Sequence, residues 1–167
     1  VVGVTQPISK WNYQIRRAED IPWAVARAFY IAKSGRPGPV VLDFAKNAQT
    51  ALIEYQPQTV DFIRSYNPVP TPEQSAIEKA AELINQSVKP LMLVGQGVEI
   101  AGAREELLAL AEKAQIPFGQ TMLGLSAAPT SHPLNMGMLG MHGNLAPNVM
   151  TNQCDLLIAV GMRFDDR

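Results

Sequence analysis

The sequence predicts an α/β fold built on a parallel, doubly wound sheet of the Rossmann-like kind. Three observations favour this fold class. Short apolar runs at 40–44, 91–94 and 156–160 have the length and composition of buried parallel strands. Segments with the three-and-four apolar spacing of helices separate these runs. Gly95 and Gly161 follow two of the runs directly, as in the strand-to-loop turns of such sheets.

Composition narrows the functional class. The 167 residues are 47% hydrophobic and 17% charged, enough to bury a core in one domain, or in one domain and part of another. The 14 basic and 15 acidic residues nearly cancel, which argues against nucleic-acid and membrane-surface binding. The single cysteine, Cys154, excludes an internal disulfide. With no leader pattern and no long apolar window, we expect a cytoplasmic chain.

The first half predicts one helix–strand unit followed by a linker. Residues 1–18 show no clean period, whereas Asp20 can cap a helix that ends near Gly35 and leads into the strand at 40–44. Four prolines gather between Lys46 and Pro72. We therefore expect a first domain over 1–46, a linker over 47–72 and a second domain over 73–167.

The second half alternates helices and strands. Thr71, Pro72 and Gln74 form a variant capping box for a helix to about Ser87, with an apolar face made by Ile77, Ala80, Ala81, Leu83 and Ile84. A second helix is expected over 101–114, with Leu107, Leu108, Leu110 and Ala111 facing inward. A short strand at 117–121, a methionine-rich loop at 122–141, a helix at 142–152 delayed by Pro147 and a strand at 155–160 complete the prediction.

The candidate site lies where the predicted strands end. Gly95, Thr121 and Gly161 should meet at one edge of the sheet, where open α/β sheets bind ligands. The Gly95-Gln96-Gly97 turn is an incomplete dinucleotide fingerprint, because Ile100 replaces its third glycine and Gln120-Thr121 replace its acidic residue. A nucleotide site and a glycine turn without a ligand both remain open.

Two further segments could complete such a site. After Gly161, two arginines, Arg163 and Arg167, lie beside two aspartates, Asp165 and Asp166. Arginine suits a pyrophosphate or a carboxylate and aspartate suits ribose hydroxyls, although the four residues could also form a surface ion-pair cluster. The loop from Leu139 to Gly143 could place methionine against a flat ring. His142, His132 and Cys154 are expected to be structural, and no metal cluster, catalytic triad or P-loop is predicted.

Three blocks resemble a known family. Ser34–Asp43 resembles the segment that closes the pyrimidine-binding domain of thiamine-diphosphate-dependent enzymes. Met138–Gly143 and Gly161–Arg167 resemble the large catalytic subunit of acetohydroxyacid synthase, also called acetolactate synthase. The resemblance implies that the chain begins with the end of the pyrimidine-binding domain and continues into a truncated central domain of a thiamine-diphosphate enzyme.

The resemblance implies a transferase of branched-chain amino-acid biosynthesis that joins two pyruvates, or pyruvate and 2-ketobutyrate, with loss of CO₂. It implies FAD here, and thiamine diphosphate and Mg²⁺ only in the complete enzyme. Lys46 would lie near the substrate channel, within Ala-Lys-Asn where the family commonly has Pro-Lys-Asp. The residues that would contact FAD are Arg36, Gly95, Gln96, Gly97, Thr121, Met122, Leu139, Gly140, Met141, His142, Gly161, Met162, Arg163, Phe164 and Asp165.

The ends of the chain favour a fragment, and the resemblance implies that this fragment lacks the parts that hold thiamine diphosphate and Mg²⁺ and is therefore inactive alone. It starts at Val1 and stops soon after an apolar run. The resemblance implies ketoacid substrates and a homo-oligomer. It does not decide whether a regulatory small subunit binds the complete enzyme. Two alternatives remain: a stand-alone nucleotide-binding module, and a segment of another thiamine-diphosphate enzyme such as pyruvate oxidase, glyoxylate carboligase or oxalyl-CoA decarboxylase.

Overall fold

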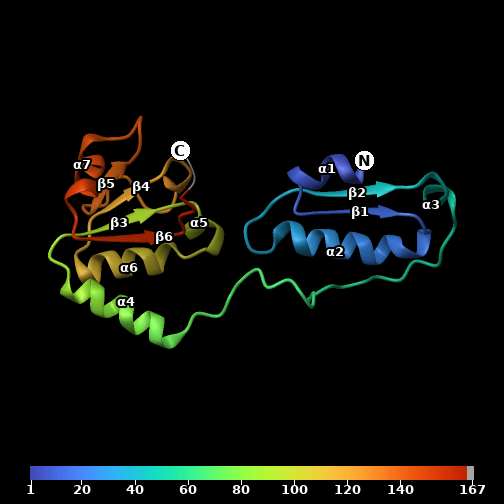
Figure 1. The fold of residues 1–167 in the computed structure, drawn as a ribbon, viewed down its shortest axis with the longest axis horizontal. Coiled ribbons are helices and arrows are strands. Elements are labelled where there is room, and N and C mark those ends of the chain that lie inside the picture. Colours follow the sequence, from blue (N-terminus) through green and yellow to red (C-terminus); the bar gives the residue numbers. More distant parts are fainter. Residues whose placement is uncertain (165–167) are drawn as a thin grey trace. The chain divides into compact units, whose positions relative to one another are not determined.

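A computed structural model describes residues 1–164 (Figure 1). The chain divides into two compact units, Val1–Thr71 and Pro72–Arg167. Each unit holds its own parallel sheet, as the fold-class prediction requires. No helix in the described part of the chain is long and apolar enough to cross a bilayer.

The first unit is a strand–helix–strand unit. β1 (Trp11–Ile15) and β2 (Val40–Phe44) pair in parallel, and α2 (Ile21–Lys33) connects them. Short turns flank these elements: α1 (Val2–Thr5), η1 (Gln6–Ile8), η2 (Ala18–Asp20) and α3 (Lys46–Thr50). The small core joins Ile15, Ala24 and Ala48. α2 and β2 confirm the predicted helix and strand.

Two parts of this unit differ from the prediction. β1 lies in the segment without a clean period, and α3 begins in what was expected to be extended chain. Asp20 is the N-cap residue of α2, but its side chain makes no capping hydrogen bond. The carboxyl end of α2 is held by a side chain. Lys10 Nζ donates there to the carbonyl oxygens of Ile31 (2.6 Å), Ser34 (2.7 Å) and Arg36 (2.9 Å). A cation is favoured there because helix carbonyls carry partial negative charge.

The second unit holds a four-stranded parallel sheet in the order β5-β4-β3-β6. Its strands are β3 (Pro90–Val94), β4 (Phe118–Gln120), β5 (Asn135–Met138) and β6 (Leu156–Val160). Its helices are α4 (Gln74–Gln86), α5 (Gly97–Ala101), α6 (Arg104–Ala114), η3 (Met122–Gly124) and α7 (Leu145–Gln153). β3, β4 and β6 confirm predicted strands, whereas β5 was expected to be loop.

Helices cover both faces of this sheet (Figure 1). Phe118 is fully buried in a core with Leu107 and Ala111 of α6. The next residue, Gly119, faces the other way because side chains alternate along a strand. A Cβ on Gly119 would lie 2.9 Å from Pro147 of α7. The small residue therefore lets α7 pack directly on the strand.

The helices on the α6 side differ from the prediction in four details. The helix expected over 101–114 is α6, which begins at Arg104; Gly102, at φ +67°, separates it from the additional helix α5, and Leu110 is exposed rather than inward. Glu73 takes the N-cap position of α4, so the capping box on Thr71 was wrong. The apolar face of α4 is also wrong, since Ile77 and Leu83 are 49% and 48% exposed. Within this unit only Ile84 of that face packs against the core.

Asp155 fixes the turn between α4 and β3. Its carboxylate accepts hydrogen bonds from the Ser87 hydroxyl, from the Val88 amide (2.7 Å) and from the Lys89 amide (2.9 Å). These donors, the Ser87 hydroxyl above all, hold the pKa of the Asp155 carboxyl below its usual value. The start of β6 is thereby tied to the start of β3.

Candidate functional site at the carboxyl edge of the sheet

The four strand ends of the second unit meet along one edge. Backbone hydrogen bonds of 2.9 Å link them in sequence: Leu139 N to Gln120 O, Thr121 N to Val94 O, and Gly95 N to Val160 O. The predicted meeting of Gly95, Thr121 and Gly161 is therefore present, and β5 adds a fourth strand end that was not expected. Parallel strands lie about 4.8 Å apart, so the edge is long enough for an extended ligand.

The glycines of the Gly95-Gln96-Gly97 turn are needed by the protein's own packing. Gly97 N donates to Gly161 O at 3.0 Å, and a Cβ on Gly97 would lie 2.6 Å from the Gly161 Cα. Gly161 has φ +62°, which favours glycine, and a Cβ there would lie 2.6 Å from the Val98 amide nitrogen. These contacts join the ends of β3 and β6. The presence of glycine at positions 97 and 161 therefore does not by itself indicate a ligand.

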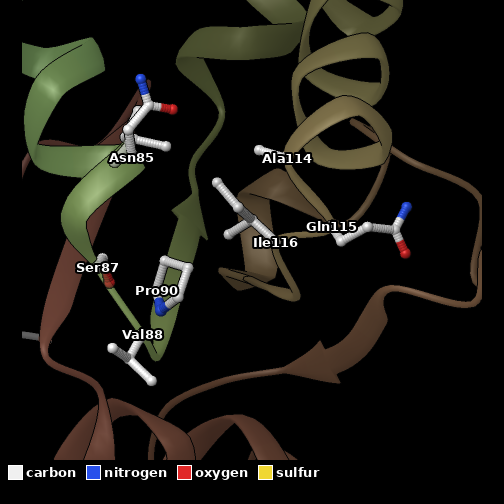
Figure 2. A pocket seen from close by; sticks show the side chains of 8 residues that line it. Asn85, Ser87, Val88, Pro90, Ala114, Gln115 and Ile116 are labelled. Atoms are coloured by element: carbon white, nitrogen blue, oxygen red, sulfur yellow. The ribbon is translucent and has the colours of Figure 1, made fainter.

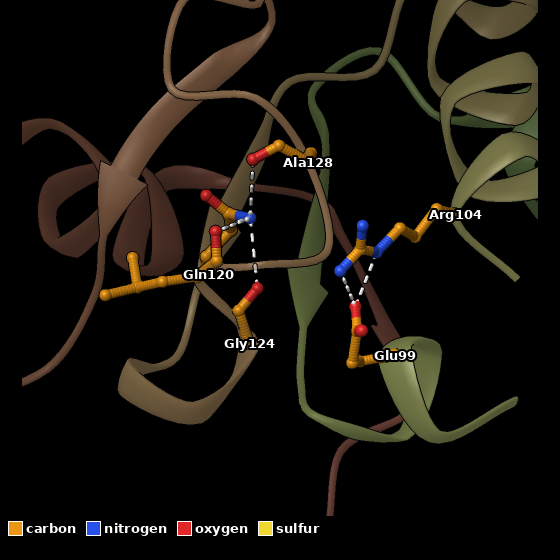
Figure 3. A network of polar contacts seen from close by, with 6 residues as sticks. Glu99, Arg104, Gln120, Gly124 and Ala128 are labelled. Atoms are coloured by element: carbon orange, nitrogen blue, oxygen red, sulfur yellow. Dashed lines mark hydrogen bonds and ion pairs between the residues drawn. The ribbon is translucent and has the colours of Figure 1, made fainter. Parts of the chain in front are cut away.

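The helix after this turn is too short to form a phosphate site at its amino end. α5 has five residues and carries Glu99 in its first turn, so its dipole is small and an acidic group lies near its start. Arg104 forms an ion pair with Glu99, as Figure 3 shows. This pair links α5 to α6 and partly neutralises the carboxylate.

Gln120 is a buried amide rather than a ligand at the strand end. Its side chain is 2% exposed, and its Nε2 donates to the Gly124 carbonyl oxygen at 3.0 Å and to those of Leu125 and Ala128 at longer range (Figure 3). Its Oε1 accepts from Asn135 Nδ2 at 2.9 Å. The amide thus holds the segment after β4 against β5.

Exposed apolar side chains extend from three of these loops. Met122 follows β4 and is 68% exposed, Met141 follows β5 and is 94% exposed, and Phe164 follows β6 and is 66% exposed. Phe164 also has φ +51°, a backbone conformation that aromatic residues rarely adopt and that is found more often at functional sites. Arg163 beside it is exposed.

This set fits a flavin nucleotide by its chemistry. Apolar side chains can lie against a flat ring, and a guanidinium can pair with a phosphate. Gly140, at φ +108°, would place a Cβ in open space, so its backbone is accessible to a ligand. Within residues 1–164, no three His, Cys, Asp or Glu side chains gather in the way that metal ligands do.

The structure brings together most of the predicted site residues. Fourteen of the fifteen expected FAD contacts are described, and thirteen of these follow the four strands of the second unit. Arg36, exposed after α2, and Lys46, exposed at the start of α3, belong to the first unit. Asp165 lies outside the described residues. His132 is placed as a structural residue, with its Nε2 3.2 Å from Glu112 Oε1 and its ring beside Phe118.

The cavity in Figure 2 lies away from this edge. It has a volume of about 320 Å³ and is lined by residues that end α4 and α6 and begin β3, among them Ser87, Pro90 and Gln115. These residues lie at the amino ends of the strands, opposite the candidate site. None of them was predicted as a site residue.

Comparison with known proteins decides the family. Residues 77–167, more than half of the chain, match the family described as "Thiamine pyrophosphate enzyme, central domain". The chain belongs to this family. The central domain covers the whole sheet of the second unit and every site residue predicted there, and the resemblance drawn from the sequence is confirmed.

Relatives and a solved structure agree with this assignment. The acetolactate synthase large subunit of Corynebacterium glutamicum is 45% identical over 99% of the chain, and the isozyme 1 large subunit of Escherichia coli is 43% identical over 99%. The chain spans 26% and 29% of their lengths. An X-ray structure of a candidate thiamin diphosphate-dependent enzyme from Mycobacterium smegmatis has a TM-score of 0.74 and 28% identity, covering 97% of this chain and 31% of that one.

Sequence reasoning missed the side chains that hold the site in place. Asn148 of α7 hydrogen-bonds to Gly140 in the loop after β5, and Asn144 accepts from Met138 N at the end of β5. Gln120 and Asn135 join β4 to β5. The available signal was a pair of asparagines four residues apart just after a glycine-rich loop. Such amides commonly bond to nearby backbone.

Proposed function

We propose that this chain is a segment of an acetolactate synthase large subunit, whose complete form joins two pyruvates, or pyruvate and 2-ketobutyrate, with loss of CO₂ in the cytoplasm. One observation carries the proposal: relatives that are 43–45% identical over 99% of the chain are named acetolactate synthase large subunits. Because the chain spans under a third of those relatives, the reaction itself belongs to the complete protein.

Within that protein, we propose that the carboxyl edge of the second unit binds FAD. Met122 and Met141 would lie against the flavin ring, Arg163 would pair with the pyrophosphate, and the Gly140 backbone would allow close approach. Arg36, Lys46 and Asp165 keep their predicted roles as part of the proposal. The FAD would have a structural role, while thiamine diphosphate with Mg²⁺ would supply the carbanion chemistry.

The test uses the complete protein, purified and stripped of cofactors. Pyruvate is supplied with thiamine diphosphate and Mg²⁺, with and without FAD, and acetolactate is measured. The proposal expects acetolactate only when all three cofactors are present. Pyruvate consumption that yields no acetolactate would favour another thiamine-diphosphate enzyme, and FAD binding without turnover would favour a nucleotide-binding module.

A further inference from the structure

The loop that joins β5 to α7, Leu139–Gly143, is held at both ends by backbone hydrogen bonds. Leu139 N donates to Gln120 O at 2.9 Å, and Asn144 N donates to Met138 O at 2.6 Å. Inside the loop, Gly143 N donates to Gly140 O at 3.0 Å. The loop is therefore a closed turn with fixed ends.

Asn148 holds the middle of this turn. Gly140 N donates to its Oδ1 at 2.9 Å, and its Nδ2 donates to Gly140 O at 2.9 Å. The amide thus bonds to both backbone groups of Gly140, whose φ of +108° favours glycine, and it shares the Gly140 carbonyl oxygen with Gly143 N. Asn144 adds one bond on the strand side, accepting from Met138 N at 2.9 Å.

The residues that this turn presents are exposed. Met141 is 94% exposed, His142 is also exposed, and both follow the residue that Asn148 fixes. Because the backbone of the turn is already fixed, only the rotamer freedom of the Met141 side chain remains to be lost when it meets a ligand. A turn of this kind suits recognition of a flat ring.

We infer that Asn148 is the positioning residue for the flavin-binding loop: it does not contact FAD, but it fixes the backbone that places Gly140 and Met141 against the ring. This inference rests on the proposed function. Asn148 lies on α7, apart from the glycine turn and from Arg163. The inference therefore adds a residue of α7 to the site.

The test compares three variants of the complete protein. Asn148→Leu keeps the volume and removes both hydrogen bonds. Asn152→Leu is the matched control, because Asn152 is an exposed amide one turn further along α7 whose Nδ2 donates to the Asn148 carbonyl oxygen and not to the loop in the described part of the chain. Asn148→Asp is the conservative variant: its carboxyl can accept from Gly140 N in either charge state, but it can donate to Gly140 O only when protonated.

Two readouts separate the inference from the proposed function. Amide hydrogen exchange in a peptide over 138–144, measured without FAD, reports whether Asn148 holds the turn. Titration with FAD, followed by the flavin absorption band, reports whether the held turn matters for binding. We expect Asn148→Leu to speed exchange in this peptide and to weaken FAD about tenfold, with a shifted flavin band, and Asn152→Leu to change neither.

For Asn148→Asp, FAD affinity relative to the unmodified protein should rise as the pH falls from about 6 toward about 4, the range in which a carboxyl begins to be protonated. His142 is the titratable group among β4, β5, the loop and α7, and comparison with the unmodified protein at each pH cancels its effect. Unchanged exchange in Asn148→Leu would overturn the inference whether or not FAD binds. Faster exchange with unchanged FAD affinity would overturn the positioning role alone. An unmodified protein that binds no FAD would contradict the proposed function together with the flavin part of the inference.

Discussion

Single residues at the strand ends show which sequence signals concern packing and which concern ligands. Gly97 and Gly161 looked like ligand-contacting glycines, but their missing side chains make room for each other's backbone. Gln120 stood where a dinucleotide fingerprint has an acid, yet it is a buried amide that bonds to carbonyl oxygens. Met122, Met141 and Phe164 are exposed apolar side chains at the strand ends, which the proposed flavin would cover.

The glycine contact can be tested by substitution. Gly161→Ala should lower the free energy of unfolding by about 2–4 kcal/mol, because a Cβ would combine a positive φ with a clash 2.6 Å from the Val98 nitrogen. Gly102→Ala is the control: its φ is +67°, but a Cβ there meets nothing within 4 Å, so about 1–2 kcal/mol is expected. Urea denaturation measures both, and equal losses would refute the role of the contact.

Asp155 predicts how stability depends on pH. Its pKa is lowered in the folded state, so its stabilising effect is present above the ordinary carboxyl pKa and is lost as the pH falls through the lowered value. Asp155→Asn should lower stability near neutral pH and reduce the loss of stability on the acid side. Urea midpoints between pH 7 and pH 3 test this, with Glu82→Gln, an exposed carboxylate on α4, as control. If the urea midpoints of Asp155→Asn and of the unmodified protein fall equally with pH, Asp155 does not contribute to the loss of stability in acid.

At the scale of elements, the sequence predicted the helices and strands whose apolar residues recur with a clear spacing. α2, β2, β3, β4 and β6 follow from apolar spacing, glycine and proline. β5 was missed because Asn135 and Gly137 interrupt its apolar character, and its partner β4 is only three residues long. β1 was missed because its aromatic residues alternate with polar amides and do not form an apolar run. Sequence spacing also could not show that α4 finds little within its own unit to cover Ile77 and Leu83.

The hydrogen bonds between β4, β5 and the segment after β4 predict a cost for replacing Gln120. Gln120→Met keeps the approximate volume but leaves the Gly124 carbonyl and the Asn135 amide without their partner. We expect a loss of about 1–3 kcal/mol in the free energy of unfolding, measured by denaturant titration. Gln120→Glu should cost more, because an ionised carboxylate would face carbonyl oxygens in a buried site. A Glu variant as stable as the unmodified protein would contradict this description of the network.

At the scale of the whole molecule, the sequence predicted the fold class and the family, and the sheet order brought the candidate residues together. The arrangement of β3, β4 and β6 could be anticipated because parallel strands with helical connections place their ends at one edge. The side chains that fix the loops could not, because Asn148 and Gln120 act through backbone groups that only the folded chain brings near.

Arg163 gives a prediction for the complete protein. If its guanidinium makes a charge-assisted bond to the cofactor, Arg163→Ala should weaken FAD binding by about 1.5–3 kcal/mol. Flavin titration by isothermal calorimetry measures the change. Arg104→Ala is the control, because Arg104 pairs with Glu99 between α5 and α6. An unchanged affinity for Arg163→Ala would return this residue to a surface ion-pair role.

The most direct test is a crystal structure of the complete protein with FAD. The central claim is that the carboxyl edge of the four-stranded sheet binds the flavin. It predicts the ring against Met122 and the turn from Leu139 to Met141, with Asn148 still bonded to Gly140 behind it. Cofactor bound at the amino edge, in the cavity beside Ser87 and Gln115, or elsewhere in the protein would contradict the claim.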